Sequence, residues 1–167
     1  MNRVEISEEM RRAQAEFHEI VEVASAQDLR RRSDGTRWTN RQLLFHIVLG
    51  YAVVRTLLPL VHALGRLGHS RGFAAVLNAG HYPFHLINYL GSCAGGQILS
   101  TRAMAALLDR TIHVLQRDLV RESDSELALT MHFPATWDPY FQPIMSVIDV
   151  YHFGTQHFDH HRRQLTV

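Results

Sequence analysis

Near the start of the chain, apolar residues recur at alternating steps of four and three, and this spacing strongly constrains the fold. Such steps place side chains on one face of an α-helix. The first set is Ile6, Met10, Ala13, Phe17, Ile20 and Ala24. A second set is Met104, Leu108, Ile112, Leu115 and Leu119. The alternation typical of β-strands never extends beyond a few residues, so the sequence predicts an all-α fold.

Four long helices are predicted from these patterns and from capping residues. We expect the first to begin near Ser7, because two acidic residues follow it. The second begins at Thr39, which has capping-box spacing with Gln42. The third begins after Ser100 or Thr101, and the fourth covers about 144–163.

The sequence signals are weaker in the segments between these helices and near Pro59. Pro59 is expected to kink or end the second helix. Several glycines interrupt residues 65–96, where we expect one or two short helices or an ordered excursion. The prediction is therefore one domain, residues 1–167, built as a four-helix bundle with an extra helical excursion between helices two and three.

Composition excludes some classes of function. The formal net charge is only +1, so the chain lacks the basic excess of a nucleic-acid-binding protein. Arg55 lies near the centre of the longest apolar run, which argues against a membrane span. The N-terminus has no apolar signal region, and Cys93 is the single cysteine. We therefore expect a cytoplasmic protein that does not bind nucleic acid or membranes, with Cys93 in a structural role.

The segment HFDHHRRQL, from His157 to Leu165, carries the clearest chemical signal. His157 and His161 are four residues apart in a predicted helix, so both imidazoles project from one face, roughly 6 Å apart at their Cβ atoms. This arrangement supplies half of a metal site. The alternative is a polar helix end, where a protonated histidine is mildly favourable.

The other histidines are weaker candidates. His160 and His152 point away from the face that the pair shares, on angular grounds. His81 and His85 also have helical spacing, but Pro83 between them disfavours a helix unless it lies at the helix start. Five others stand alone and need no special role: His18, His62, His69, His113 and His132.

A third ligand should come from another helix, and His46 is the best candidate. It lies one or two turns into the second helix among apolar residues, where a lone histidine has no obvious polar partner. A satisfied core histidine is the ordinary explanation for such a residue. Bundle cores are nevertheless where sites of this kind are assembled, and three neutral imidazoles suit Zn²⁺, Ni²⁺, Fe²⁺ or Co²⁺.

Two segments carry a family resemblance. They are TRWTNRQLLFHIVLGY, which contains His46, and YHFGTQHFDHHRRQL, which contains His157 and His161. With them, the chain resembles the DinB-like metalloenzyme superfamily, in a form typical of actinobacteria. That resemblance implies a four-helix bundle with one histidine ligand on helix two and an HxxxH pair on helix four. It assigns His46, His157 and His161 as metal ligands, most often for Zn²⁺ or Ni²⁺. The region from Gly65 to Gly96 departs from the short family core.

The resemblance also implies a class of reaction. Characterised relatives include transferases and isomerases that use a low-molecular-weight thiol, such as mycothiol or bacillithiol, with a divalent metal. We therefore expect a thiol S-transferase that acts on small electrophiles, with a homodimer as one option for its assembly. A metal lowers the pKa of a bound thiol, so no cysteine nucleophile from the protein is required. Two alternatives stay open: a non-catalytic, stress-associated metal-binding bundle, and a hydrolase that uses metal-bound hydroxide.

Residues around the expected site receive weaker assignments. Gln164 lies three residues after His161 on the same stripe, where it could hydrogen-bond a ligand imidazole. Asp159 is expected to pair at the surface with Arg162 or Arg163. Three aromatic residues are expected to anchor the core or loops, or else to line a pocket: Trp38, Trp137 and Tyr140. The three consecutive arginines at 30–32 are expected either to form a solvated helix end or to attract an acidic thiol cofactor.

Overall fold

The computed structural model describes residues 2–68 and 70–167, so His69 lies outside the described residues. The described part forms eight helices and two short strands. Their bounds are α1 Arg3–Val23, α2 Ala26–Arg30, α3 Asn40–Leu67, α4 Arg71–Ala79, α5 His81–Ile98, α6 Thr101–Arg121, α7 Asp124–Leu127, β1 Thr130–His132, β2 Ile144–Ser146 and α8 Val147–Arg162.

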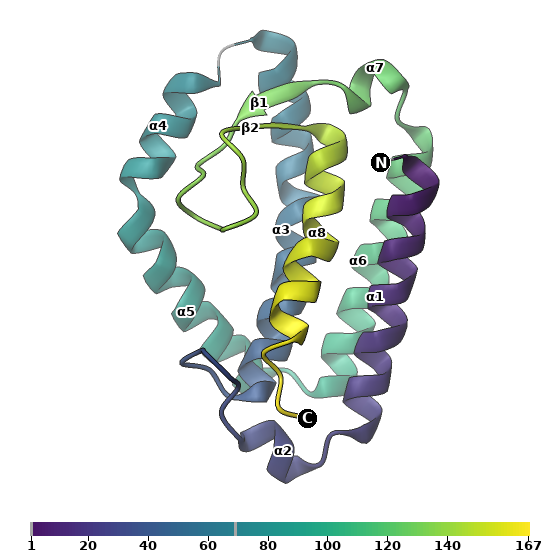
Figure 1. Cartoon of the computed structure of the whole chain (residues 1–167), viewed down its shortest axis with the longest axis vertical. Helices are drawn as coiled ribbons and strands as arrows, with labels where there is room; N and C mark the ends of the chain where they lie inside the picture. Colours follow the sequence, from purple (N-terminus) through teal and green to yellow (C-terminus); the bar gives the residue numbers. More distant parts are fainter. Residues whose placement is uncertain (1, 69) are drawn as a thin grey trace.

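Four of these helices form the bundle predicted from the sequence. α3 packs against α6 and α8, and α1 packs against the same two helices (Figure 1). The two apolar sets named above, except Ile20 and Ala24, are buried in its core. Because the steps of three and four keep these side chains on one face, the helices bury continuous apolar stripes against one another. The all-α bundle is therefore confirmed.

Capping residues set the starts of the helices. The Thr39 side chain accepts a hydrogen bond from the backbone N–H of Gln42, whose side chain accepts from the N–H of Thr39, as predicted. Ser100 caps α6. The predicted start of the first helix near Ser7 was wrong. Asn2 caps α1 through a reciprocal pair of bonds with Glu5, and this cap extends the helix one turn toward the N-terminus.

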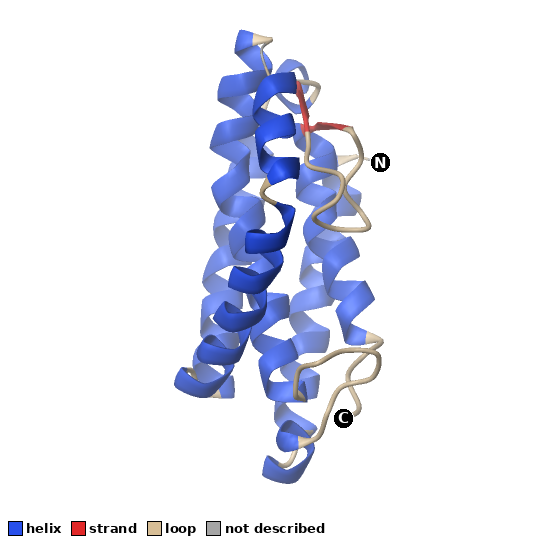
Figure 2. Cartoon of the chain, turned by 90° about the vertical axis from the view of Figure 1, so that its left-hand side faces the viewer, coloured by secondary structure: helices blue, strands red, loops and turns tan. Residues whose placement is uncertain are grey.

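The predicted start of the last helix was also wrong by three residues. Ile144–Ser146 form β2, which pairs antiparallel with β1, with Met131 opposite Met145. Ser146 then caps α8 by exchanging hydrogen bonds with Asp149. Figure 2 shows this two-stranded sheet at one end of the molecule, where it closes the loop that joins the strands.

Pro59 does not end the second long helix. α3 continues through it to Leu67, so ending the helix, one of the two predicted effects, is excluded. Pro59 is exposed, and the carbonyl that loses its backbone donor can bind water there. The helix stops at Gly68, whose φ of 69° is the left-handed conformation that favours glycine at a helix end.

The predicted excursion consists of α4 and α5. α5 packs against α3, and both excursion helices run beside the bundle (Figure 1). The loop between β1 and β2 lies between these helices and the α3–α8 pair. Trp137 in this loop stacks on Phe84 of α5 at 3.9 Å and donates a hydrogen bond from Nε1 to the Leu77 carbonyl. The loop is thereby anchored to both excursion helices.

α3 is long and apolar enough to cross a membrane by length and composition. Half of its most apolar window is buried inside the protein, where α3 contacts α5, α6 and α8. Its central place in the bundle accounts for this composition.

Candidate metal centre

The imidazoles of His46, His157 and His161 meet between α3 and α8. Nε2 of His46 lies 3.1 Å from Nε2 of His161 and 3.2 Å from Nε2 of His157. The three potential ligand atoms all lie within 4.8 Å of one another. His46 and His157 are buried, and His161 is partly exposed. The structure therefore brings together the three residues that the sequence analysis selected.

Hydrogen bonds at the opposite ring nitrogens set the protonation of two of these rings. Ser92 Oγ donates to the Asn88 carbonyl at 2.8 Å, so it accepts a hydrogen bond from His46 Nδ1 at 3.2 Å. His161 Nδ1 donates to Gln164 Oε1 at 2.7 Å, at the position predicted for Gln164. Both rings thus carry their proton on Nδ1, and each Nε2 presents a lone pair to the centre.

This arrangement fits a cation. The lone pairs on Nε2 of His46 and His161 face each other across 3.1 Å with no proton between them. Two acceptors at this distance repel unless a positive charge lies between them. Three imidazole nitrogens with further hydrogen bonds behind them are a typical donor set for a divalent transition metal. The chemistry of the residues present therefore agrees with a metal site.

The three rings are held neutral, as metal ligation requires. Burial lowers the pKa of His46 to about 3, and the neighbouring His161 and His160 lower it further. Burial also lowers the pKa of His161 to about 4, against the raising effect of Gln164. For His157, burial and then the other imidazoles hold the pKa well below 6.5. Neutral imidazoles bind metals without first releasing a proton.

A glycine makes room for the most buried ring. A Cβ atom at Gly50 would lie 2.3 Å from Nδ1 of His157, a separation that real Cβ atoms essentially never show. Nδ1 of His157 is buried and has no hydrogen-bond partner among the described residues. Its orientation is therefore set by packing against α3, whereas the other two rings are oriented by hydrogen bonds.

The cluster lies between two hollows. A small, partly enclosed pocket of about 60 Å³ is lined by His46 and His157, with Phe84, Trp137 and Asp138 among its other walls. A more open cleft of about 340 Å³ is lined by His161 and Gln164, with walls from α5 and the loop before α3. A group bound at the cluster is thus near both a small internal space and a larger one open to solvent.

Trp38 lies between His46 and the cleft, which His161 lines directly. Its ring stacks on His46 with centroids 4.4 Å apart and 28° between the planes. It also stacks on Tyr89 of α5 at 6.0 Å. Trp38 thus has both roles considered for it, since it anchors the loop before α3 and lines a cleft.

One acidic residue lies beside the partly enclosed pocket. The Asp138 carboxylate accepts a hydrogen bond from the Tyr140 N–H at 2.9 Å. Burial raises the pKa of Asp138, against the lowering effects of this bond and of His160. A carboxyl group with a raised pKa beside a candidate metal centre can exchange protons with a bound molecule.

Comparison with known proteins agrees with this geometry. A family model of the DinB superfamily matches residues 9–165. The chain belongs to the DinB superfamily. Neither the curated proteins nor the solved structures gave a match. The match runs from residue 9 to residue 165 and therefore includes both excursion helices, α4 and α5.

The other histidines that the structure describes in this DinB superfamily chain lie outside the cluster. His152 pairs with Glu9 at 2.9 Å, and the Tyr140 hydroxyl is 3.5 Å from Nδ1 of His160. Pro83 lies in the first turn of α5, so the rings of His81 and His85 do come together, at 4.4 Å. Three of the histidines described as isolated have polar partners: His18 with Asp109, His62 with Glu122 and His132 with Ser70.

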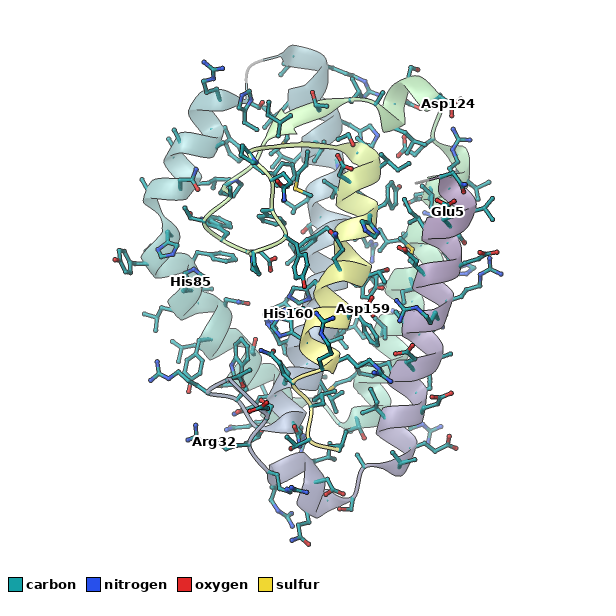
Figure 3. All side chains as sticks on the ribbon, viewed as in Figure 1. Glu5, Arg32, His85, Asp124, Asp159 and His160 are labelled. Atoms are coloured by element: carbon teal, nitrogen blue, oxygen red, sulfur yellow. The ribbon has the colours of Figure 1, made fainter. Side chains whose placement is uncertain are left out.

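The expected partner of Asp159 was wrong. Its carboxylate receives two hydrogen bonds from Arg12 of α1, at 3.0 and 2.9 Å, instead of pairing with Arg162 or Arg163. Figure 3 shows Asp159 on the side of α8 that faces α1, and His160 on the side toward α5. Arg162 pairs with Glu16 of α1 instead. These ion pairs join α8 to α1 on the side away from the cleft.

Sequence reasoning missed several residues of this site. Gly50 lies one turn after His46 on the same helix face, and that spacing was a usable signal for a close approach. Ser92 had no such signal, because its contact with His46 depends on how α5 packs against α3. Asp138 comes from a loop whose path is set by the anchoring of Trp137.

Proposed function

We propose that this protein is a divalent-metal enzyme that transfers a low-molecular-weight thiol to a small electrophile, in the cytoplasm. The observation that carries the proposal is the convergence of three neutral imidazoles, two of them with Nδ1 satisfied by Ser92 and Gln164. His46, His157 and His161 would hold the metal. Three protein ligands leave a position open for a substrate, as in catalytic rather than structural sites.

The metal, when bound, would lower the pKa of a coordinated thiol so that the nucleophile forms near neutral pH. The chain itself supplies orientation and exclusion of water. Ser92 and Gln164 hold two ligand rings, and Trp38 covers His46. The partly enclosed pocket has space for a small functional group but not for a whole substrate, so the open cleft would receive the remainder.

The single cysteine supports this assignment. Cys93 is partly buried, and it does not line either hollow beside the cluster. A thiol nucleophile must therefore come from a second molecule.

Metal analysis and thiol conjugation together test the proposal. We expect about one equivalent of metal in the wild type and less than about a tenth in His157→Ala, because losing one of three ligands removes most of the affinity. Conjugation would be measured with mycothiol, bacillithiol and glutathione against a set of small electrophiles. One equivalent of metal with no conjugation by any thiol would contradict the transferase and favour a structural metal.

A metal-dependent hydrolase is the second candidate, and Asp138 is the observation that favours it. The carboxyl lines the same pocket as His46 and His157, where it could accept a proton from a bound water. Asp138→Asn would then abolish ester hydrolysis without changing metal content. Conjugation of a thiol that survives this substitution would favour the transferase.

A further inference from the structure

The cleft beside His161 has the chemistry of an anion-binding site. Its described lining contains one permanent positive charge, on Arg37, and no acidic residue. The remaining walls are aromatic or neutral: Gly35, Thr36, Trp38, His85, Asn88, Tyr89 and Gln164. Figure 3 shows His85 on α5, the helix that lines the cleft together with the loop before α3. The volume of about 340 Å³ suits a small molecule.

Arg37 is positioned by stacking rather than by an ion pair. Its guanidinium carbon lies 5.3 Å from the ring centroid of Tyr89. Tyr89 stacks on Trp38, which stacks in turn on His46. No carboxylate pairs with Arg37 in the part of the chain that the structure describes, so its N–H donors remain free for a ligand. A stack of planar groups thus runs from a free cation to a candidate metal ligand.

We propose that Arg37 binds the carboxylate of an acidic thiol co-substrate whose sulfur is placed at the histidine cluster. This inference rests on the proposed thiol chemistry and adds the chemical class of the thiol. A guanidinium binds a carboxylate through two parallel hydrogen bonds, which fix the orientation of the bound molecule as well as its affinity. The run 30–32, considered above for the same role, does not line the cleft.

The test uses binding rather than turnover. Protein loaded with Co²⁺ would be titrated with mercaptoacetate, 3-mercaptopropionate and 6-mercaptohexanoate, and with the amide of each. The thiolate-to-Co²⁺ absorption band reports the dissociation constants. Arg37→Gln is the test variant. Arg30→Gln is the matched control, because it removes the same charge from an exposed position outside the cleft.

We expect the wild type to prefer at least one carboxylate over its amide, and Arg37→Gln to reduce this preference at least about tenfold. Amide binding, the Co²⁺ spectrum without thiol and all values for Arg30→Gln should be unchanged. If Arg37→Gln and Arg30→Gln prefer the carboxylate over its amide equally, the proposed role of Arg37 is overturned, whereas thiol binding at the cluster is not. If no thiol changes the Co²⁺ spectrum, the proposed thiol chemistry itself fails.

A separate observation concerns the outer face of α5, which is apolar where solvent should favour polar groups. Between Arg71 and Arg102 the sequence contains no Asp, Glu, Lys or Arg. The exposed large hydrophobic residues of α5 are Tyr82, Leu86, Ile87, Leu90 and Ile98, and Tyr82 is 83% exposed. The inward face is more polar, since Asn88 and Ser92 point toward the histidine cluster. This helix is therefore amphipathic in the reverse sense to the bundle helices.

We infer that this face is covered by a second copy of the chain. An uncharged face is complementary to itself, because a two-fold axis brings no like charges together. A charged partner would bury its own charges against it without compensation. Gly91 and Ala94 are exposed on the same face, so the two helices could approach closely.

Sedimentation equilibrium of the full chain tests this second inference. We expect a dimer for the wild type and a monomer for the double variant Leu86→Glu with Leu90→Glu, with unchanged helical circular dichroism. Val120→Glu is the control, because Val120 is similarly exposed on α6. A monomeric wild type, a dimer that persists in the double variant, or flotation of a monomer with lipid vesicles would each overturn the inference.

Discussion

Gly50 and His157 are in direct contact across the α3–α8 interface, and a Cβ at position 50 would lie 2.3 Å from the Nδ1 atom of His157. Alanine in the middle of a helix ordinarily stabilises it by about 1 kcal/mol relative to glycine. At this position we expect the opposite. Gly50→Ala should displace the His157 ring, lower the metal content below half an equivalent and destabilise the protein by about 1–3 kcal/mol, measured by metal analysis and urea unfolding.

Gly72→Ala provides the control for this prediction. A Cβ at position 72 in α4 would have no atom within 4 Å, so helix propensity alone should act there. We expect unchanged metal content and equal or slightly higher stability. If the two alanine variants bind metal equally well, the contact with His157 does not position a ligand.

Gln164 is predicted to strengthen metal binding through His161. Its Oε1 atom accepts the Nδ1–H of that ring at 2.7 Å. Gln164→Ala should weaken zinc affinity by about 10–100-fold, the usual effect of removing such a partner. Gln164→Glu keeps an acceptor in place and should retain the wild-type affinity. Competition with a chromophoric chelator measures both, and equal affinities in all three proteins would contradict the prediction.

The stability of the metal-free protein should depend on pH through the three imidazoles of the cluster. Their folded-state pKa values lie below 6.5, at about 3 for His46 and about 4 for His161. Below 6.5 the unfolded chain therefore binds protons that the folded chain does not. Stability is retained above pH 6.5 and falls as the pH drops toward 4, by up to about 1.4 kcal/mol per histidine per pH unit.

Urea unfolding in the presence of a chelator measures this dependence. A variant with glutamine at positions 46, 157 and 161 should show a shallower decline between about pH 6.5 and about pH 4.5, because its cluster no longer titrates. The same slope in both proteins would place the relevant titration elsewhere in the chain.

Zinc should raise the thermal stability of the wild type. A ligand that binds only the folded state adds about 2.7 kcal/mol when its free concentration is one hundred times the dissociation constant. His157→Gln should lose this gain, whereas His152→Gln should keep it, because His152 pairs with Glu9 outside the cluster. Melting curves at increasing zinc concentration give the comparison. A full zinc effect in His157→Gln would remove this residue from the site.

The features that follow from local spacing could be predicted from the sequence. Thr39 and Gln42 are three residues apart, and the reciprocal cap at the start of α3 needs nothing from the rest of the chain. The common face of His157 and His161 is likewise a property of one helix. His46 required more, because its meeting with them depends on the packing of α3 against α8, and the family resemblance supplied that information.

The features that depend on tertiary packing could not be predicted. Ile144–Ser146 read as part of a helix, but pairing with β1 makes them a strand, so α8 starts three residues later. Asp159 has Arg162 and Arg163 nearby in sequence, and the nearness of α1 gives it Arg12 instead. Neither competitor is visible in the local pattern, because both lie more than ten residues away along the chain.

Through the hydrogen bond from His46 to Ser92, α5 contributes directly to the candidate metal centre. A shortened protein reduced to the four bundle helices would keep all three imidazoles. It would lose the Ser92 hydroxyl, which accepts the Nδ1 proton of His46, and Tyr89, which stacks on Trp38. It would also lose one wall of each of the two hollows beside the cluster. We therefore expect the sequence of α4 and α5 to vary together with the reaction among related proteins. Swapping this segment between relatives is accordingly a rational way to exchange their substrates.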